Sequence, residues 1–314
     1  MTKLTIIVPV KNEQESIELF LDALFEIKDK VAVSLDVLFV DDGSTDNTLR
    51  SIDNIQSKYD GVISTGYISL SRNFGKEAAM YAGLEHASGD LVAFMDVDLQ
   101  DPVYLLPEMV DDVLSDKYDA VAAKRVNRDH EAVLRSKLSD MFYWFMNKIS
   151  GVQLEKGERD FRVMNRQVVS ALLSLGESKR FSKGMFHWVG FNTKYIPYDN
   201  EARLAGTSSW SMSQLIGYAI DGIVGFSMKP LLLVSMAGML LFGVSLISIL
   251  FVIIRALVDP SSSAFGWASL VSIVLLVSGL QLMSLGVIGR YISDIFIETK
   301  NRPQYIIKKI KKQG

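Results

Sequence analysis

The sequence has no cysteine, no N-terminal run with the features expected of a signal peptide, and no glycine fingerprint of a common nucleotide-binding loop. Without cysteine no disulfide can form, which fits a reducing compartment. The stretch Leu4–Val10 is too short for a signal peptide and contains Pro9, so we expect the N-terminal part to stay where it is made. Because neither a Walker nor a dinucleotide-type glycine pattern occurs, phosphate groups would have to be bound by a metal and by basic side chains.

Charged residues are absent from two long segments in the last third of the chain. Leu231–Ile254 and Phe265–Ile288 each contain 24 residues without a charge. As helices, each would be about 36 Å long at about 1.5 Å per residue. A buried core helix is the alternative, but helices that are apolar on all sides are rare inside a domain of this size. The sequence therefore predicts two transmembrane helices.

The charged residues outside these two segments indicate how the chain is oriented in a membrane. The formal net charge of −3 argues against nonspecific binding of nucleic acid. Lys229 precedes the first predicted span and a basic segment follows the second, so the positive-inside rule places both termini in the cytoplasm. This basic segment could touch anionic lipid headgroups or only fix the topology. Its cations are Arg290, Lys300, Arg302, Lys308, Lys309, Lys311 and Lys312.

These features divide the chain into four expected parts. Residues 1–210 form a cytoplasmic α/β domain, and 211–229 form an amphipathic juxtamembrane helix that would hold this domain against the bilayer. Residues 230–289 hold the two transmembrane helices, and 290–314 form a basic cytoplasmic tail. The apolar stripe of the juxtamembrane helix consists of Leu215, Ile216, Ala219, Ile220, Ile223 and Val224.

Strands alternate with helices over the first hundred residues, and a polar loop follows each strand. This alternation predicts a doubly wound, mainly parallel sheet, in which the loops after the first, second and fourth strands meet at the carboxyl edge. The predicted strands are Leu4–Val10, Leu35–Val40, Tyr67–Leu70 and Leu91–Met95.

The fourth predicted strand ends in a cluster of oxygen ligands. Carboxylates that face a cleft repel an anionic substrate unless a cation lies between them, so Asp96, Asp98 and Gln100 indicate a divalent metal that holds phosphates. The alternative is that these residues start a helix, and we expect this role for Asp101, as an N-cap before Pro102.

The second predicted strand ends in Asp41 and Asp42. A carboxylate at this edge can accept hydrogen bonds from ribose hydroxyls or from the imino N–H of a pyrimidine base. Capping of the following helix is the alternative, and it explains Ser44–Asp46 better than it explains the two aspartates.

Four motifs carry a resemblance to a known family. Taken in this order, the motifs resemble those of family 2 glycosyltransferases of the GT-A fold. More narrowly, they resemble those of the polyprenyl-phosphate glycosyltransferases, which include dolichyl-phosphate mannose synthase and bactoprenol glucosyl transferases. The two apolar segments extend the resemblance over nearly the whole chain. The motifs are Val8–Glu13, Val40–Asp46, Ser71–Lys76 and Asp96–Asp101.

The resemblance implies roles for individual residues. Mg²⁺ or Mn²⁺ would stabilise the charge that develops on the leaving nucleoside diphosphate, with Asp96, Asp98 and Gln100 as its ligands. The implied nucleotide site consists of Pro9, Asn12, Glu13, Asp41, Asp42 and Asp96, with Asp42 on the base. The implied site for the lipid phosphate consists of Arg125, Arg135 and Ser139.

Arg135 lies beside a helical stripe of large apolar residues, Leu134–Ile149, which packs in a core or lies on a membrane surface. The resemblance also implies a mobile loop that places Arg203 on the donor diphosphate, although Ser209 stands where the family usually has lysine. Together with Asp98 and Arg203, Asp160 is a candidate catalytic residue.

The resemblance places Asp160 beside the acceptor as a proposed base. A phosphate monoester has a second pKa of about 6 and is already anionic at neutral pH, which favours a positioning role for Asp160. An ion pair between Asp160 and Arg162 is the structural alternative. His187 has no identifiable partner and is expected to be structural.

The resulting hypothesis is an inverting glycosyltransferase in a bacterial cytoplasmic membrane. It would transfer glucose from a UDP-sugar to undecaprenyl phosphate for modification of a cell-envelope glycan. The alternatives are another donor sugar, such as N-acetylglucosamine or galactose, or a non-enzymatic membrane partner with a degenerate nucleotide-binding domain. A processive polymer synthase is disfavoured because the Gln-x-x-Arg-Trp signature is absent. Glycines within the spans would permit close packing in a homo-oligomer.

Overall fold

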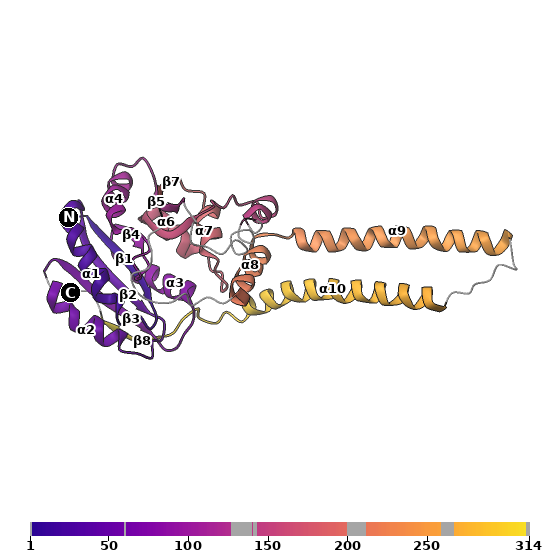
Figure 1. The fold of residues 1–314 in the computed structure, drawn as a ribbon, viewed down its shortest axis with the longest axis horizontal. Coiled ribbons are helices and arrows are strands. Elements are labelled where there is room, and N and C mark those ends of the chain that lie inside the picture. Colours follow the sequence, from indigo (N-terminus) through magenta and orange to yellow (C-terminus); the bar gives the residue numbers. More distant parts are fainter. Residues whose placement is uncertain are drawn as a thin grey trace.

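The computed structural model describes residues 2–59, 61–126, 140, 143–199, 212–258 and 267–311. Within these residues, eight strands form one mixed sheet (Figure 1). In sheet order the strands are β7 (Thr193–Tyr198), β5 (Ala120–Arg125), β6 (Glu158–Asn165), β4 (Leu91–Phe94), β1 (Lys3–Val10), β2 (Ser34–Asp41), β3 (Ile63–Leu70) and β8 (Ile307–Lys311).

The four central strands, β4, β1, β2 and β3, are parallel to one another. Val10, the last residue of β1, lies opposite Asp41, the last residue of β2. The loops that follow β1, β2 and β4 therefore leave the sheet at the same edge. β6 is antiparallel to β4 and β5, whereas β5 and β7 are parallel to each other. The mainly parallel α/β sheet predicted from the sequence is confirmed.

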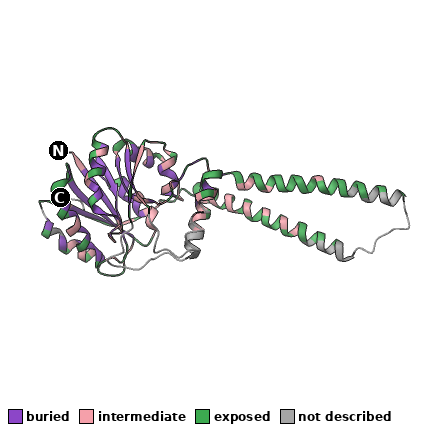
Figure 2. Cartoon of the chain, turned by 45° about the horizontal axis from the view of Figure 1, so that its top comes forward, coloured by how far each residue is buried: buried purple, intermediate pink, exposed green. Residues whose placement is uncertain are grey.

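Helices cover both faces of the sheet, and the buried residues lie along the strands and on the helix sides that face them (Figure 2). Ile17, Phe20 and Leu24, at helical spacing, turn one side of the first helix towards the sheet. One face carries α1 (Ser16–Ile27), α2 (Thr48–Tyr59) and α4 (Leu106–Leu114), and the other carries α3 (Lys76–His86), α6 (Arg166–Ser174) and α7 (Ser182–Trp188). Two 3₁₀ turns, Lys28–Lys30 and Val103–Leu105, connect elements on the first face.

The C-terminal third is helical and extends away from the sheet (Figure 1). Helix α8 (Met212–Phe226) leads into α9 (Lys229–Val258), and α10 (Trp267–Thr299) returns beside it. Two segments of the described residues, Lys229–Ser248 and Leu276–Thr299, are long and apolar enough to cross a membrane. Most of their apolar side chains are exposed (Figure 2). Both predicted apolar helices are therefore present as helices.

The chain returns to the sheet after α10. The segment 290–314, expected as a basic tail, is divided by the structure: α10 continues to Thr299, and β8 pairs antiparallel with β3 at the edge of the sheet. Lys311 Nζ lies 2.8 Å from an oxygen of Asp53 on α2. Part of the basic segment thus belongs to the α/β domain, which is joined to the apolar helices through both α8 and α10.

Candidate active site

The loop after β1 is tied to the loop after β2. Asn12 has a φ of 56°, a left-handed conformation that asparagine tolerates better than most residues. Its Oδ1 accepts a hydrogen bond from the amide of Thr45 at 2.8 Å, and its own amide donates to Ser44 Oγ at 2.9 Å. The amide of Glu13 donates to Thr48 Oγ1 at 2.9 Å. The Asn12 side chain therefore holds together two loops of the expected nucleotide pocket, just beyond Pro9 in β1.

Asp41 and Asp42 are buried and accept hydrogen bonds from within the chain. Asp41 accepts from Ser69 Oγ at 2.8 Å and from the amide of Ser44 at 2.9 Å. Asp42 accepts from the amides of Phe74 at 2.6 Å and Gly75 at 2.9 Å. Burial raises the pKa of Asp42, and these two amide bonds oppose the rise. Both carboxylates thus anchor loops, while contact of Asp42 with a base stays a prediction.

Gly43 lies where the loop after β2 meets the loop after β3. Its φ is 69°, and an added Cβ would lie 2.6 Å from the carbonyl carbon of Arg72 and 2.7 Å from the amide nitrogen of Asn73. Such distances to backbone atoms require one of the two loops to move. The close approach fixes the loop that precedes α3.

We expect Gly43→Ala to lower the free energy of unfolding by about 3 kcal/mol, from left-handed backbone strain and from overlap with a neighbouring loop. Gly61→Ala is the matched control. Gly61 has a φ of 79° but no heavy atom within 4 Å of its added Cβ, so this variant carries only the backbone strain of about 1 kcal/mol. Thermal unfolding of the purified variants measures the difference in stability between them. Equal losses of stability in the two variants would contradict the close approach of the two loops at Gly43.

Lys76, the first residue of α3, joins two acidic side chains at the carboxyl edge. Its Nζ lies 2.7 Å from Asp96 Oδ1 and 2.7 Å from Asp160 Oδ2. Burial alone would lower the pKa of Lys76, but the charges of Asp160 and Asp96 raise it, so the ammonium group stays charged. Lys76 lies in one of the four motifs, but no role was predicted for it from the sequence. The structure places it at the centre of the site.

Asp160, on β6, is held as a carboxylate. Burial would raise its pKa, but the charges of Lys76 and Lys183 together hold the pKa well below its usual range. Such a carboxylate is a weak base, and the positioning role favoured from the sequence stays a prediction. Its ion-pair partner is Lys76, not Arg162, so the alternative pairing of Asp160 with Arg162 is wrong.

Asp101 does not cap a helix, and that prediction is wrong. The turn that follows begins after Pro102 without any side-chain cap. The side chain of Asp101 is buried instead, and its Oδ1 accepts hydrogen bonds from Arg159 Nε at 3.0 Å and from Tyr198 Oη at 3.1 Å. It thereby ties the loop after β4 to β6 and β7, and it orients Arg159. The other end of that guanidinium, Nη2, lies 3.9 Å from Asp96 Oδ2.

The three residues expected to bind a metal at the carboxyl edge of the sheet offer oxygen ligands that suit a cation also bound by a substrate. Asp96, Asp98 and Gln100 are all half-buried, and Asp98 Oδ1 accepts from the amide of Gln100 at 3.2 Å across a turn with Leu99 at a φ of 55°. Among the described residues no group of three or more histidine, cysteine, aspartate or glutamate side chains could hold a metal alone. Two carboxylates and one amide fit Mg²⁺ or Mn²⁺ if substrate phosphates and water complete the coordination.

The expected acceptor site is described only in part. Arg125 ends β5, with its amide bonded to the carbonyl of Gly157 at 2.9 Å. Arg135, Ser139 and Arg203 lie outside the described residues. Their roles stay predictions.

A buried charge cluster holds β6 in place. Arg162 forms an ion pair with Glu158, and both side chains are about 2% exposed or less. His187 Nε2 lies 2.7 Å from Glu158 Oε2, and the Arg162 guanidinium lies 3.3 Å from the centre of the Phe186 ring. His187 thus has a partner that the sequence did not reveal. Because this strand also carries Asp160, the cluster fixes the backbone that positions the site.

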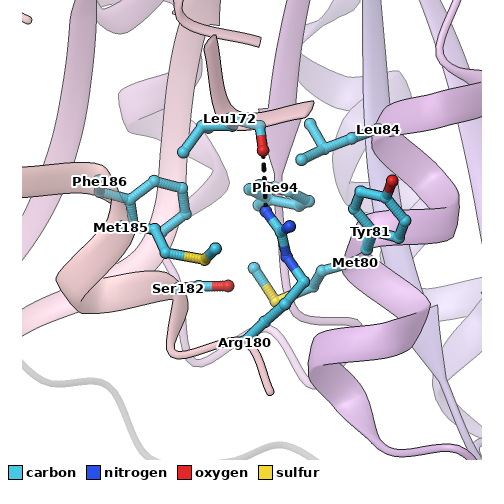
Figure 3. A pocket seen from close by; sticks show the side chains of 9 residues that line it. All are labelled: Met80, Tyr81, Leu84, Phe94, Leu172, Arg180, Ser182, Met185 and Phe186. Atoms are coloured by element: carbon cyan, nitrogen blue, oxygen red, sulfur yellow. Dashed lines mark hydrogen bonds between the residues drawn. The ribbon is translucent and has the colours of Figure 1, made fainter. Parts of the chain in front are cut away.

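A small cavity lies elsewhere, between α3, α6 and α7 (Figure 3). At about 10 Å³ it has room for about one water molecule. Arg180 points into it and donates to the carbonyls of Leu175 at 2.8 Å and Leu172 at 3.1 Å, at the end of α6. This arrangement caps a helix and offers no space for a substrate.

Comparison with known proteins gives a consistent result. Residues 5–170 match the family described as Glycosyl transferase family 2. A putative glycosyltransferase of Bacillus subtilis strain 168, CsbB, is 43% identical over 305 residues, which cover 97% of this chain and 91% of the relative. A bactoprenol glucosyl transferase of Shigella phage SfII is 39% identical over 307 residues, which cover 98% of each chain.

A prophage bactoprenol glucosyl transferase homolog of Escherichia coli K12 is 36% identical over 310 residues, which cover 99% of this chain and 100% of the relative. Among solved structures, glucosyl-3-phosphoglycerate synthase from Mycobacterium tuberculosis, in complex with Mn²⁺, UDP and glucosyl-3-phosphoglycerate, has a TM-score of 0.48 and 18% identity. That alignment covers 71% of this chain and 78% of the synthase.

Proposed function

The chain belongs to glycosyl transferase family 2, and we propose that it transfers glucose from UDP-glucose to undecaprenyl phosphate at the cytoplasmic face of a bacterial membrane. One observation carries the proposal. The same chain joins a sheet edge with acidic ligands and cations, at Asp96, Asp98 and Lys76, to two helices apolar enough to span a bilayer. Such an enzyme can take a water-soluble donor and a lipid acceptor. Relatives named bactoprenol glucosyl transferase support the choice of acceptor and sugar.

The proposed reaction is a single displacement with inversion. An oxygen of the lipid phosphate attacks the anomeric carbon, the bond from this carbon to the donor diphosphate breaks, and UDP leaves with the bonding electrons. A divalent metal on Asp96, Asp98 and Gln100 would stabilise the charge on the leaving group. Lys76 and Arg159 add positive charge at the same edge. Asp160, held as a carboxylate by Lys76, positions the acceptor instead of removing a proton.

The helical region would bring the site to the lipid. We propose that α9 and α10 span the membrane, with the catalytic domain and both termini in the cytoplasm. Ile223 and Phe226 of α8 pack against Phe181 of the domain, which would hold the domain close to the bilayer. A cavity of about 380 Å³ with a mainly apolar lining opens between α8, α9 and α10, and Arg290 lies in its wall. This cavity could receive part of an isoprenoid chain.

The test is a transfer assay with the full chain purified in detergent. The protein is incubated with undecaprenyl phosphate, Mn²⁺ or Mg²⁺, and labelled UDP-glucose, UDP-N-acetylglucosamine or UDP-galactose, and the label in the lipid fraction is counted. We expect glucose in the lipid fraction and none of it after chelation of the metal. Transfer of a different sugar would correct the donor. Absence of any transfer, together with no Mn²⁺-dependent binding of UDP by calorimetry, would favour a non-enzymatic partner.

A further inference from the structure

Lys76 occupies a position in its helix where a lysine is unfavourable. It is the first residue of α3, where the partial positive charge of the helix N-terminus repels a cation. Asp42 binds the amides of the two preceding residues, Phe74 and Gly75, and so fixes the turn that delivers Lys76 to the carboxyl edge. The local cost is offset by two carboxylates that come from other elements, Asp96 and Asp160.

Asp96 faces cations of the protein on both of its oxygens. Lys76 Nζ lies 2.7 Å from Oδ1, and Arg159 Nη2 lies 3.9 Å from Oδ2. The Asp96 side chain is only 25% exposed and that of Lys76 31%, so water screens this pair less than it screens a surface pair. A divalent cation at Asp96 would have to share this carboxylate with an ammonium group or displace it, and two such cations a few ångströms apart repel each other strongly.

We propose that Lys76 is a positioning residue that competes with the divalent metal for Asp96. In the free protein Lys76 neutralises Asp96 and joins it to Asp160. When the donor binds, its diphosphate supplies the negative charge that allows Lys76 and the metal to occupy the edge together. Metal and nucleotide therefore bind with positive coupling, and metal alone binds weakly. This inference rests on the proposed function, because it takes the donor to be a nucleoside diphosphate sugar.

The experiment measures Mn²⁺ affinity instead of sugar transfer. Free Mn²⁺ is counted by electron paramagnetic resonance during titration of the full chain in detergent, first without nucleotide and then with UDP. We expect Lys76→Met to bind Mn²⁺ alone about tenfold more tightly than the wild type, because the competing charge is gone. UDP should then tighten Mn²⁺ binding less in the variant than in the wild type.

Lys194→Met is the matched control. Lys194 also joins two carboxylates, with its Nζ 3.1 Å from Glu108 and 2.6 Å from Asp112, but these lie on α4. Its loss should leave Mn²⁺ affinity unchanged. Lys76→Arg keeps the charge, so its Mn²⁺ affinity should stay within about twofold of the wild-type value. If Lys76→Met does not fold, Lys76→Gln takes its place.

Unchanged or weaker Mn²⁺ binding by the uncharged Lys76 variants would overturn the inference. An increase in Mn²⁺ affinity in Lys76→Arg as large as that in Lys76→Met would also overturn it. Tighter binding of Mn²⁺ alone in a protein that transfers no sugar would support the competition at Asp96 and reject only the proposed reaction. If the wild type binds no Mn²⁺ even with UDP, the competition is rejected, and the transfer assay still decides the reaction separately.

Discussion

Asp98→Asn is expected to lower the rate of sugar transfer about a thousandfold while the fold is retained. Asparagine has nearly the same shape as aspartate and keeps the Oδ1 that accepts from the amide of Gln100 at 3.2 Å. The substitution removes a negative charge from the edge where we propose that the metal lies. A neutral amide is a poorer ligand for a hard cation, so the charge on the leaving diphosphate would be left without its main stabilisation.

The measurement is the initial rate of glucose transfer to undecaprenyl phosphate at saturating Mn²⁺, with thermal unfolding to show that the variant is folded. Asp111→Asn makes the same chemical change at an exposed position of α4 and should leave the rate unaltered. Turnover close to that of the wild type in Asp98→Asn would remove this residue from the site. A parallel loss of rate and of thermal stability would instead indicate a structural role.

The sequence predicted the centre of the sheet well, for a physical reason. Strands buried on both faces are continuous apolar runs, and the runs that became β1, β2 and β4 can be recognised without knowledge of their partners. β6 was not predicted as a strand because Glu158, Arg159, Asp160 and Arg162 give it the composition of a loop. Its charges are accommodated by partners distant in the sequence, which periodicity cannot show.

The motifs of the site were located correctly at the carboxyl edge, because parallel topology brings the strand ends together, and the family that they implied is confirmed by the match over residues 5–170. The ion pair of Lys76 with Asp160 was missed because the two residues are 84 positions apart in the sequence. One local signal was available: a lysine at the start of a helix is unfavourable with the helix dipole, which suggests a carboxylate nearby. Asp101 was misassigned for a related reason, since its guanidinium partner Arg159 is 58 residues away.

Arg162→Met is expected to lower the free energy of unfolding by about 3 to 5 kcal/mol, the usual effect of breaking a buried ion pair by removal of one partner. Methionine retains most of the apolar stem, so the loss reflects charge more than volume. Glu158 would keep His187, 2.7 Å away, as its remaining partner. Thermal unfolding should show a fall in the midpoint of about 10 °C.

The pH dependence and a double variant identify the cause. Burial would raise the pKa of Glu158, but Arg162 and His187 hold it below its usual value, so in the wild type this carboxylate is charged at neutral pH. Without Arg162 the pKa of Glu158 rises, because this guanidinium no longer offsets the burial. Protonation of Glu158 then removes the buried charge that Arg162 no longer balances, so the stability deficit of the variant should shrink as pH falls from 7 towards about 5. Adding Glu158→Leu should restore much of the loss, because no buried charge remains to be paired. A deficit independent of pH, or a double variant less stable than Arg162→Met, would show that packing of Arg162 on Phe186, and not its charge, holds β6 in place.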